Sequence, residues 1–294
     1  MRPLVAGKRG IVTGEPSVRR RLVGTALRRY RENVGYALDD AAKVLECDRS
    51  KISRVETGQR GIRPKELREL LTDYGVPENE QDALVGLCRR SGQRGWWEHY
   101  AGVLPDAFLD YVIMEATAAE IMIYEAQRVP DLLQIAEYAR AIAAAEPGGE
   151  FNPKRTEAMV AASAIRQELV LGGRGRLGVV VGEAALRQEV GGRAVMAEQI
   201  SRLAEFVSVY PNVALQVLPF SAGAHAAAAS SSLSVLRFPH TPSLGVVYLG
   251  SLSGGVYLDN QAHVAQYIRA FSMLQASALT IEDSARMLAQ ASVR

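Results

Sequence analysis

The stretch that decides the fold is Leu38–Pro64, with the sequence LDDAAKVLECDRSKISRVETGQRGIRP. Its pattern predicts two short helices joined by a tight turn, the first opened by a pair of aspartates and the second running over Arg49–Thr57. Asp48 directly precedes the second helix and is a residue type that caps helix N-termini. Ile52 and Val55 are apolar and face back toward a core. The polar and basic side chains at the start of this helix are therefore expected to face outward.

An exposed helix of this kind suits recognition of DNA. An α-helix fits the major groove of B-DNA, and side chains from its first turns reach the base edges. Ser50 and Arg54 lie four residues apart and share one face, and an arginine that contacts guanine through two hydrogen bonds contributes about 1–3 kcal/mol of discrimination. We expect the base-reading residues to be Arg49, Ser50, Lys51 and Arg54. Small residues, exposed amides and positive charge after the helix suit phosphate contacts, which we assign to Thr57, Gly58, Arg60 and Arg63.

Three further helices are predicted around this pair. One begins at Ser17 and has apolar residues spaced by three and four. Another begins at Pro64, a residue type favoured in the first turn of a helix, and a third runs from about Glu78 to Arg90. We therefore predict an all-α, five-helix domain over residues 17–92. It follows an arm over residues 1–16 and precedes a linker over residues 91–95.

The charge is divided unevenly along the chain. Residues 1–95 carry 20 Lys and Arg against 13 Asp and Glu, a net +7, while residues 96–294 carry 14 against 19, a net −5, which together give the net charge of +2. A polyanion is therefore expected to bind the first part of the chain. The alternative is that the excess of basic residues only forms a solvated surface.

The second part of the sequence mixes helical and strand-like patterns. Helices broken at prolines are expected over Trp96–Ala145, and further helices over residues 156–171, 193–210 and 262–276. Strands are expected over residues 177–181, 213–218, 233–238 and 246–249. We therefore predict an α+β domain over residues 96–290, with a small sheet flanked by helices.

Composition narrows the class of protein. The 294 residues suffice for two domains. The two cysteines, Cys47 and Cys88, do not form a CxxC pair, which suits a reducing cytoplasm rather than a disulfide framework or a zinc site. No apolar run approaches the 18 residues of a membrane span, and the N-terminal residues show no apolar segment typical of a secretory signal. We expect a cytoplasmic protein without a membrane partner.

The sequence shows no recognisable catalytic set. Gly173–Gly178 match GxGxxG by letter, but a helix is expected before them and a strand after them, the reverse of the dinucleotide-binding order. The four histidines are widely separated and pair with no cysteine. We expect no enzyme activity, no cofactor and no metal site.

The run Ser50–Gly58, SKISRVETG, resembles the recognition-helix signature of XRE-type (phage-repressor-like) helix-turn-helix proteins. Glu56 and Gly58 match two characteristic positions of that pattern, and Ala42 matches the small residue of the preceding helix. The resemblance implies a DNA-binding protein in which Glu56 is structural and bonds backbone at the helix end. The chain departs from the family at Leu38, where Gln is common, and at Glu46, where Gly is often found in the turn.

The sequence from Trp96 onward resembles the C-terminal domain of antitoxin-like XRE regulators of filamentous soil bacteria. The resemblance is carried by Trp96-Trp97, Tyr124-Glu125 through Gln134, Arg166-Gln167, Gly182–Leu186, Val217–Phe220 and Gly223–His225, in this order. It departs from the family pattern at Asp131, Ile135, Ser163 and Gly250. A ligand or partner pocket in this domain is expected to involve Trp97, Tyr124, Gln134, Arg166, Glu183, His225 and Tyr248.

Three functions remain open at this point. The leading hypothesis is a homodimeric transcriptional regulator that binds double-stranded DNA and responds through its C-terminal domain to a small partner protein or a metabolite. The second is an antitoxin-like interaction module whose main act is to bind a small neighbouring protein. The third is a biosynthetic enzyme built on the C-terminal domain, with the helix-turn-helix as a relic.

Overall fold

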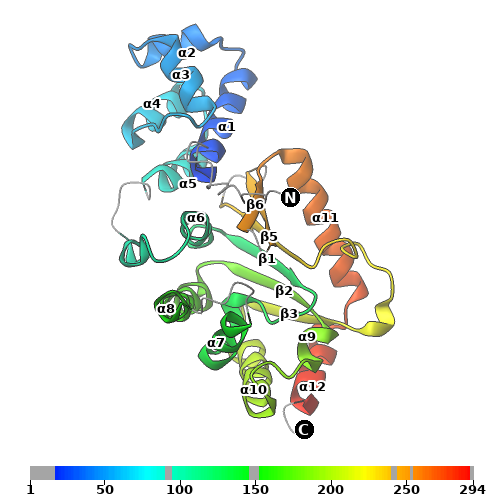
Figure 1. The fold of residues 1–294 in the computed structure, drawn as a ribbon. Coiled ribbons are helices and arrows are strands. Elements are labelled where there is room, and N and C mark those ends of the chain that lie inside the picture. The colour runs from blue at the N-terminus through cyan, green and yellow to red at the C-terminus, as the bar shows by residue number, and fades with distance from the viewer. Residues whose placement is uncertain (1–16, 90–94, 146–151, 240–243, 252–253, 292–294) are drawn as a thin grey trace, which may run out of the picture. The chain divides into compact units, whose positions relative to one another are not determined.

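The computed structural model describes residues 17–89, 95–145, 152–239, 244–251 and 254–291 (Figure 1). The chain divides into two compact units between Arg89 and Arg90. Residues 1–16 and 91–94, which were expected to form an arm and most of a linker, lie outside the described residues. Among the described helices, none is long and apolar enough to cross a membrane.

The first unit consists of helices, and the predicted five-helix domain is confirmed. The helices are α1 Val18–Asn33, α2 Leu38–Val44, α3 Arg49–Glu56, α4 Pro64–Asp73 and α5 Glu78–Arg89.

Local capping explains where the helices of the first unit begin. The Ser17 side chain accepts from the backbone N–H of Arg20 at the start of α1, at 3.4 Å. Asp48 caps α3 in the same way, because its Oδ1 accepts from the N–H of Ser50 at 2.7 Å. α4 opens with Pro64, and Oε2 of Glu66 accepts from the N–H of Arg63 at 3.3 Å. These contacts satisfy backbone donors that the helices leave unpaired at their N-termini.

The core of the first unit is aliphatic. It draws on α1, α3, α4 and α5, and its fully buried side chains include Leu22, Leu27, Ile52, Leu67, Leu70, Leu71, Leu84 and Leu87. Ile52 belongs to α3, so the face of α3 opposite its exposed residues is fixed in this core.

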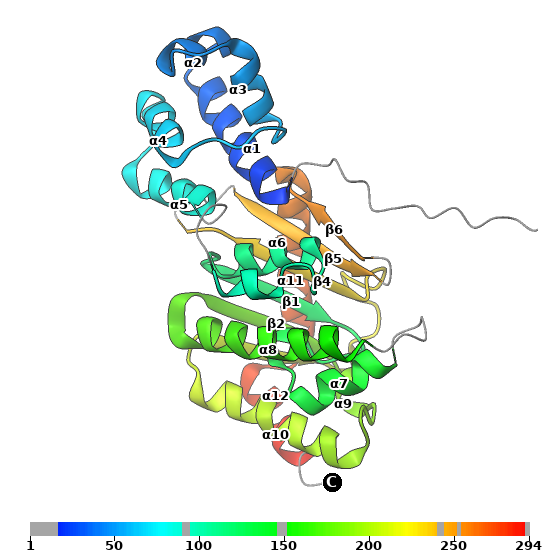
Figure 2. The ribbon, with the colours of Figure 1, turned by 60° about the vertical axis from the view of Figure 1, so that its left-hand side comes forward.

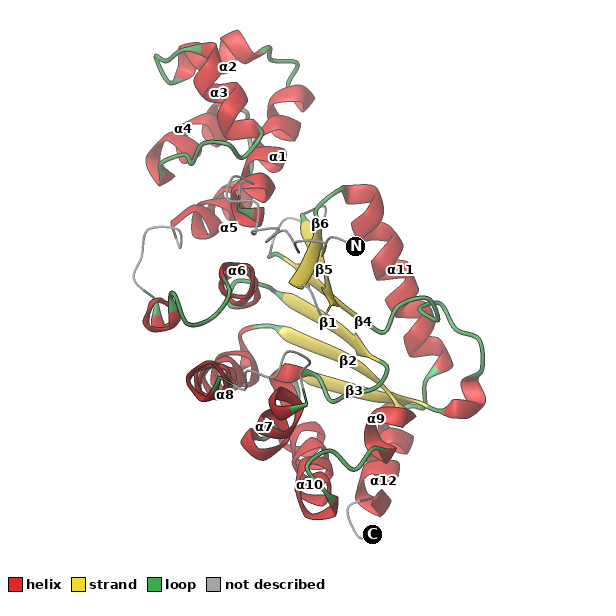
Figure 3. Ribbon diagram, viewed as in Figure 1, coloured by secondary structure: helices red, strands yellow, loops and turns green. Residues whose placement is uncertain are grey.

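The second unit is built on a six-stranded mixed sheet (Figure 3). The strand order is β3-β2-β1-β4-β5-β6, in which β1, β2 and β3 are parallel and β4, β5 and β6 continue the sheet in antiparallel fashion. The predicted α+β class is confirmed. The strands are β1 Glu120–Glu125, β2 Arg176–Gly182, β3 Val213–Leu218, β4 Ser232–Arg237, β5 Gly245–Ser251 and β6 Gly254–Leu258.

Helices cover both faces of this sheet, with α6 and α8 on one face and α11 on the other (Figures 1 and 2). α12 contacts both α10 and the edge strand β3. The helices are α6 Asp106–Glu115, α7 Ala136–Ala144, α8 Pro153–Leu169, α9 Glu183–Arg187, α10 Arg193–Val209, α11 Gln261–Ser277 and α12 Ile281–Ala291, with short helical turns η1 Trp96–Tyr100, η2 Asp131–Leu133, η3 Val170–Arg174 and η4 Phe220–Ala222.

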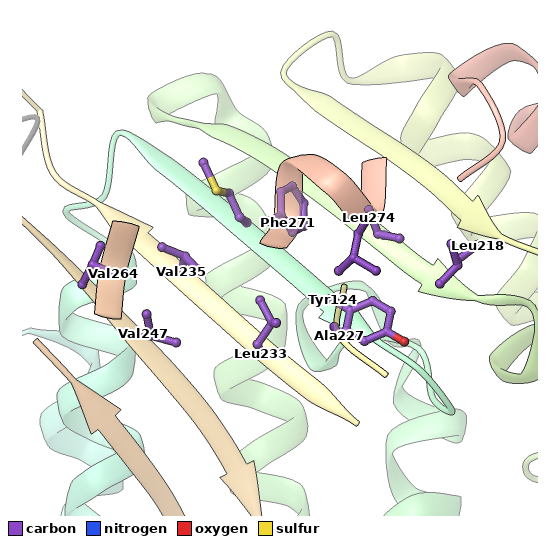
Figure 4. Close-up of a cluster of buried hydrophobic side chains, with 11 residues drawn as sticks. Tyr124, Leu218, Ala227, Leu233, Val235, Val247, Val264, Phe271 and Leu274 are labelled. Atoms are coloured by element: carbon purple, nitrogen blue, oxygen red, sulfur yellow. The ribbon is translucent and has the colours of Figure 1, made fainter. Parts of the chain in front are cut away.

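The face covered by α11 is an apolar core (Figure 4). Alternate residues of the strands point into it, as the period of two in a β-strand requires. Phe271 and Leu274 of α11 close the cluster from the helix side, and its strand residues include Met122, Tyr124, Leu233, Val235 and Val247. Tyr124 therefore belongs to this core.

Four elements of the second unit, β1, β6, α9 and α12, differ from the sequence-based expectation. The stretch over residues 96–145 was expected to be helical, but Glu120–Glu125 form β1, and the C-terminal part also contains β6 and α12. Five of the six residues of β1 are buried, because a central strand is covered on both faces. Such a strand lacks the alternation that marks a half-exposed strand, and its apolar run is easily read as part of a helix.

Candidate functional site

The outward face of α3 carries exposed polar and basic side chains. Asp48 caps the helix, and the next two residues, Arg49 and Ser50, are both exposed. Nη1 of Arg49 lies 3.7 Å from Oδ2 of Asp39 at the start of α2. With 64% and 62% of their side chains exposed, these two residues form a weak ion pair, and Arg49 is free to exchange Asp39 for another partner.

Ser50 and Arg54 lie together on this face, as the spacing predicts. Nη2 of Arg54 donates to Oγ of Ser50 at 3.1 Å, and Nε donates to the backbone carbonyl of Ser50 at 3.1 Å. The Arg54 side chain therefore lies back along the outer surface of α3. Both hydrogen bonds are exposed to solvent, so extending the guanidinium toward a ligand costs little.

Lys51 occupies a different position. Its Nζ lies 2.7 Å from Oε1 of Glu66 in α4, and 18% of the Lys51 side chain is exposed. The Lys51 ammonium lowers the pKa of Glu66 below its ordinary value. This contact joins α3 to α4 and engages the Lys51 ammonium.

The four residues assigned to phosphate contacts divide into two pairs. The amides of Thr57 and Gly58 donate to carbonyls of α3, at 3.0 Å to Ser53 and 3.0 Å to Val55, so both amides are paired at the helix end. Gly58 has a φ of 75°, and this left-handed conformation ends the helix. Gly58 is also buried beside Arg21. Arg60 and Arg63 are exposed in the following loop, where their charges are available to a polyanion.

A buried ion pair holds α3 against α1. Nε and Nη2 of Arg31 donate to the two carboxylate oxygens of Glu56, at 2.6 Å and 2.9 Å. Nη1 of Arg31 donates to the backbone carbonyl of Tyr36 at 2.6 Å. Glu56 is therefore structural, as the resemblance implies, but its partner is a buried arginine and not the backbone of its own helix end.

The seven residues expected to line a pocket in the second unit do not come together in one place. Tyr124 lies on the α11 face of the sheet, where its ring is 5.8 Å from that of His225. Glu183 begins α9, accepts from the backbone N–H of Phe220 at 2.9 Å and pairs with Arg187 at 2.7 Å. These bonds are what stabilise the ionised Glu183 and lower its pKa.

Gln134 and Trp97 also have local structural roles. Nε2 of Gln134 donates to the carbonyl of Val129 at 2.7 Å, and the carbonyl of Gln134 accepts from Gln167 at 2.9 Å. Trp97 lies in η1, with its ring 5.9 Å from that of Trp96. Nε2 of Gln134 also lies 3.4 Å from Oδ1 of Asp131.

Arg166 and Tyr248 meet on the face of the sheet that α6 and α8 cover. Strand register places Ile123, Ser234, Tyr248 and Tyr257 in one row across β1, β4, β5 and β6. The Tyr248 ring lies 5.0 Å from that of Tyr111 in α6 and 4.9 Å from that of Tyr257. Since Tyr124 is next to Ile123 in the chain, this row lies on the face opposite the α11 core.

Arg166 of α8 is buried beside Phe108 and Tyr111 of α6. Its Nε and Nη2 donate to the two carboxylate oxygens of Glu115 in α6, at 2.7 Å and 2.8 Å. The guanidinium carbon lies 5.7 Å from the centroid of the Tyr111 ring and 5.4 Å from that of Phe108. The third nitrogen, Nη1, is buried and has no hydrogen-bond partner among the described residues.

A second group of charges continues the cluster at the end of β1. Oε1 of Glu125 accepts from the Ser232 hydroxyl at 2.7 Å and lies 3.4 Å from Nη2 of Arg128. Nη1 of Arg128 lies 3.4 Å from Oδ1 of Asp131. Burial raises the pKa of Glu125 to about 7, in spite of the Arg128 charge beside it, so this carboxyl changes protonation near neutral pH.

Sequence reasoning found two members of this polar cluster and missed the others. It missed them because they come from five separate elements and a loop, and because β1 was read as helix. One available signal was the pair of polar residues in β4, spaced by two and therefore on one face of a strand. The missed residues are Tyr111, Glu115, Glu125, Arg128, Asp131, Ser232, Ser234 and Tyr257.

In the portion of the chain that the structure describes, no group of three or more His, Cys, Asp or Glu side chains is arranged to hold a metal ion. The two sites are thus a basic helix face in the first unit and a polar, aromatic cluster in the second.

Comparison with known proteins agrees with this division. A family described as a helix-turn-helix domain matches residues 22–84, and a family described as a domain of unknown function (DUF5753) matches residues 108–290. No curated protein and no solved structure matches the chain. The first match covers α3 and its neighbours, so the chain carries a helix-turn-helix domain, a type of domain that binds DNA. Because the second match covers more than half of the chain, the protein belongs to the family defined by this domain of unknown function.

Proposed function

We propose that the protein is a transcriptional regulator of the XRE type that binds operator DNA through α3. The observation that carries the proposal is the exposure of Arg49, Ser50 and Arg54 in α3, within a matched helix-turn-helix domain. In such domains the N-terminal residues of the second helix contact base edges in the major groove. The net charge of +7 over residues 1–95 supports attraction to the phosphate backbone.

The proposal includes a homodimer and control by the second unit. One helix of eight residues reads only a few base pairs, and helix-turn-helix proteins gain specificity by placing two such helices on half-sites one DNA turn apart. The second unit, with an acidic balance of −5 over residues 96–294, would respond to a ligand or partner by binding and not by catalysis. Of the four predicted base readers we retain Arg49, Ser50 and Arg54, because Lys51 is engaged with Glu66.

A gel shift of the full chain against the DNA upstream of its own gene tests the proposal. We expect a sequence-selective shift that weakens as salt rises, because binding to phosphates releases counterions. Arg54→Ala should weaken binding to the selected sequence by roughly 5- to 100-fold, the loss of about 1–3 kcal/mol that one bidentate base contact provides. Binding to unrelated DNA should change much less.

The matched control is Arg193→Ala, which removes an arginine that is 85% exposed at the start of α10 in the second unit. It should leave the shift unchanged. A folded wild-type protein that produces no shift at any salt concentration would contradict the proposal. That result would favour the antitoxin-like interaction module, for which co-purification with a small neighbouring protein is the direct test.

A further inference from the structure

The α6–α8 face of the sheet holds polar groups that the fold does not require. A sheet face covered by helices is ordinarily apolar, as the α11 face is. Here the buried set includes an arginine, two glutamates, a serine and a tyrosine, namely Arg166, Glu115, Glu125, Ser234 and Tyr111. Burying such groups costs free energy unless each finds a partner, so their concentration on one face calls for a function.

Arg166 is the centre of this set, and one of its donors is unused. Glu115 engages Nε and Nη2, while Nη1 is buried without a partner among the described residues. A buried donor that lacks an acceptor costs free energy, because it has lost its hydrogen bond to water. A ligand oxygen at Nη1 would remove this cost, which makes Nη1 a ready donor to an acceptor that enters the cluster.

Aromatic rings border this donor. Phe108 and Tyr111 lie against the guanidinium of Arg166, and Tyr248 and Tyr257 continue the row. Tyr111 is buried and hydrogen-bonds to Ser234, while Phe108, Tyr248 and Tyr257 are half-buried. The set therefore has a buried polar end and a half-buried aromatic border, an arrangement suited to a ligand with a polar group on a planar apolar body.

The charged side chains of the cluster restrict which polar group a ligand can carry. Glu115 already neutralises Arg166, and Arg128 is balanced by Asp131, with Glu125 beside both. A strongly charged group such as a phosphate dianion finds no unbalanced cation here. A carbonyl or a single carboxylate suits one free N–H donor.

We propose that this cluster binds a small planar organic molecule that presents a carbonyl or carboxylate oxygen to Nη1 of Arg166 and places its ring against Tyr111 and Tyr248. The proposal names the chemical class of the effector within the proposed function. The site stands on contacts inside the second unit, and its test needs no DNA. Failure of this test and failure of the DNA-binding test are therefore separate results.

The experiment measures binding of three one-ring probes to the full chain by ligand-observed NMR titration. Benzoate carries a carboxylate, benzamide a neutral carbonyl, and benzyl alcohol a hydroxyl on the same ring. We expect benzoate or benzamide to bind with a Kd in the low millimolar range that such small ligands reach, at least tenfold more tightly than benzyl alcohol. Tighter binding of benzoate would identify a carboxylate ligand, and equal or tighter binding of benzamide a carbonyl ligand.

The test variant is Glu115→Leu/Arg166→Met, which replaces both members of the buried pair. Replacing a whole buried ion pair by apolar residues is often neutral for stability, whereas removing Arg166 alone would leave a buried charge. We expect a folded protein whose probe binding is at least tenfold weaker. If this variant fails to fold, Tyr248→Leu removes a half-buried ring and should weaken probe binding at least fivefold.

The control applies the same exchange to an exposed pair. Arg140 of α7 donates to both oxygens of Glu157 in α8, at 2.8 Å and 2.9 Å, on the surface of the same unit. Glu157→Leu/Arg140→Met should leave probe binding unchanged. The proposal is overturned if no probe binds the wild type, if benzyl alcohol binds as tightly as benzoate and benzamide, or if the variants at Arg166 and Tyr248 retain full binding.

Discussion

Glu46 shows how a single backbone conformation affects the helix-turn-helix. It lies in the turn between α2 and α3 and has φ 47°, the one positive φ among described residues other than glycine. A side chain in the left-handed region costs about 1–2 kcal/mol because its Cβ crowds the following carbonyl. The helix-turn-helix pattern that the sequence resembles often has glycine in this turn, so the departure at Glu46 carries a cost in folding free energy.

We predict that Glu46→Gly stabilises the first unit by roughly 0.5–1 kcal/mol. The relief of strain exceeds the extra entropy that glycine gives the unfolded chain. Urea unfolding followed by circular dichroism measures the change. Glu46→Ala removes the same charge but keeps a Cβ, so it should give no comparable gain; an equal gain would assign the effect to charge instead of backbone conformation.

Glu125 makes the stability of the second unit depend on pH. Its pKa is raised from 4.5 to about 7 by burial, so the folded state holds a proton that the unfolded state releases earlier. This difference stabilises the folded state fully below about pH 4.5, and the stabilisation is lost as pH rises through 7. At 1.36 kcal/mol for each pKa unit, the free energy of unfolding falls by at most about 3 kcal/mol over this range. Glu125→Gln keeps a neutral side chain at every pH. We predict that, in urea unfolding at pH 5 and pH 8, the free energy of unfolding of the Gln variant increases relative to that of the wild type as pH rises. The same difference between the two proteins at both pH values would refute this.

At the scale of elements, the position of α3 depends on its close approach to α1. Gly24 is buried in α1, and a Cβ placed there would lie 2.4 Å from the carbonyl oxygen of Val55 and 2.6 Å from that of Glu56. These are backbone atoms at the end of α3, so a side chain at position 24 must displace the helix. The Arg31–Glu56 ion pair spans the same contact and would be disturbed with it.

We predict that Gly24→Ala destabilises the first unit by about 2–3 kcal/mol, the cost of overpacking a tight contact, and weakens DNA binding by displacing α3. Gly86 in α5 is the matched control, because a Cβ there meets no atom within 4 Å. Gly86→Ala should stabilise the same unit by about 0.5–1 kcal/mol through helix propensity. Thermal unfolding of both variants tests the pair, and the account of Gly24 would be abandoned if the two substitutions had the same sign.

The elements also show what the sequence could and could not predict. The five helices of the first unit were predictable because each has a surface face, and therefore a helical period, together with a local start signal such as Asp48 or Pro64. β1 was missed because burial on both faces removes its alternation. The cluster around Arg166 was only partly predictable, since it joins residues as far apart as Tyr111 and Tyr257, and only strand register and helix packing bring these together.

At the scale of the whole molecule, the net charge differs along the chain, at +7 over residues 1–95 and −5 over residues 96–294. Exposed charges are screened beyond about 10 Å in 0.1 M salt. The salt dependence of DNA binding should therefore report the arginines that lie at the DNA, and not the net charge of +2 of the entire chain. Arg60 and Arg63, exposed after α3, are the residues on which this distinction can be tested.

We predict that Arg60→Ala and Arg63→Ala each lower the slope of log affinity against log salt by about 1, because each phosphate contact contributes one released counterion. Both variants should weaken binding to selected and unrelated DNA alike, whereas Arg54→Ala acts mainly on the selected sequence. Fluorescence anisotropy at several salt concentrations separates these effects. Arg193→Ala in the second unit should leave the slope unchanged, because in the proposed function only the first unit contacts DNA. A slope change at Arg193 equal to that at Arg60 would mean that DNA also contacts the second unit, and the division of labour between the units would then be wrong.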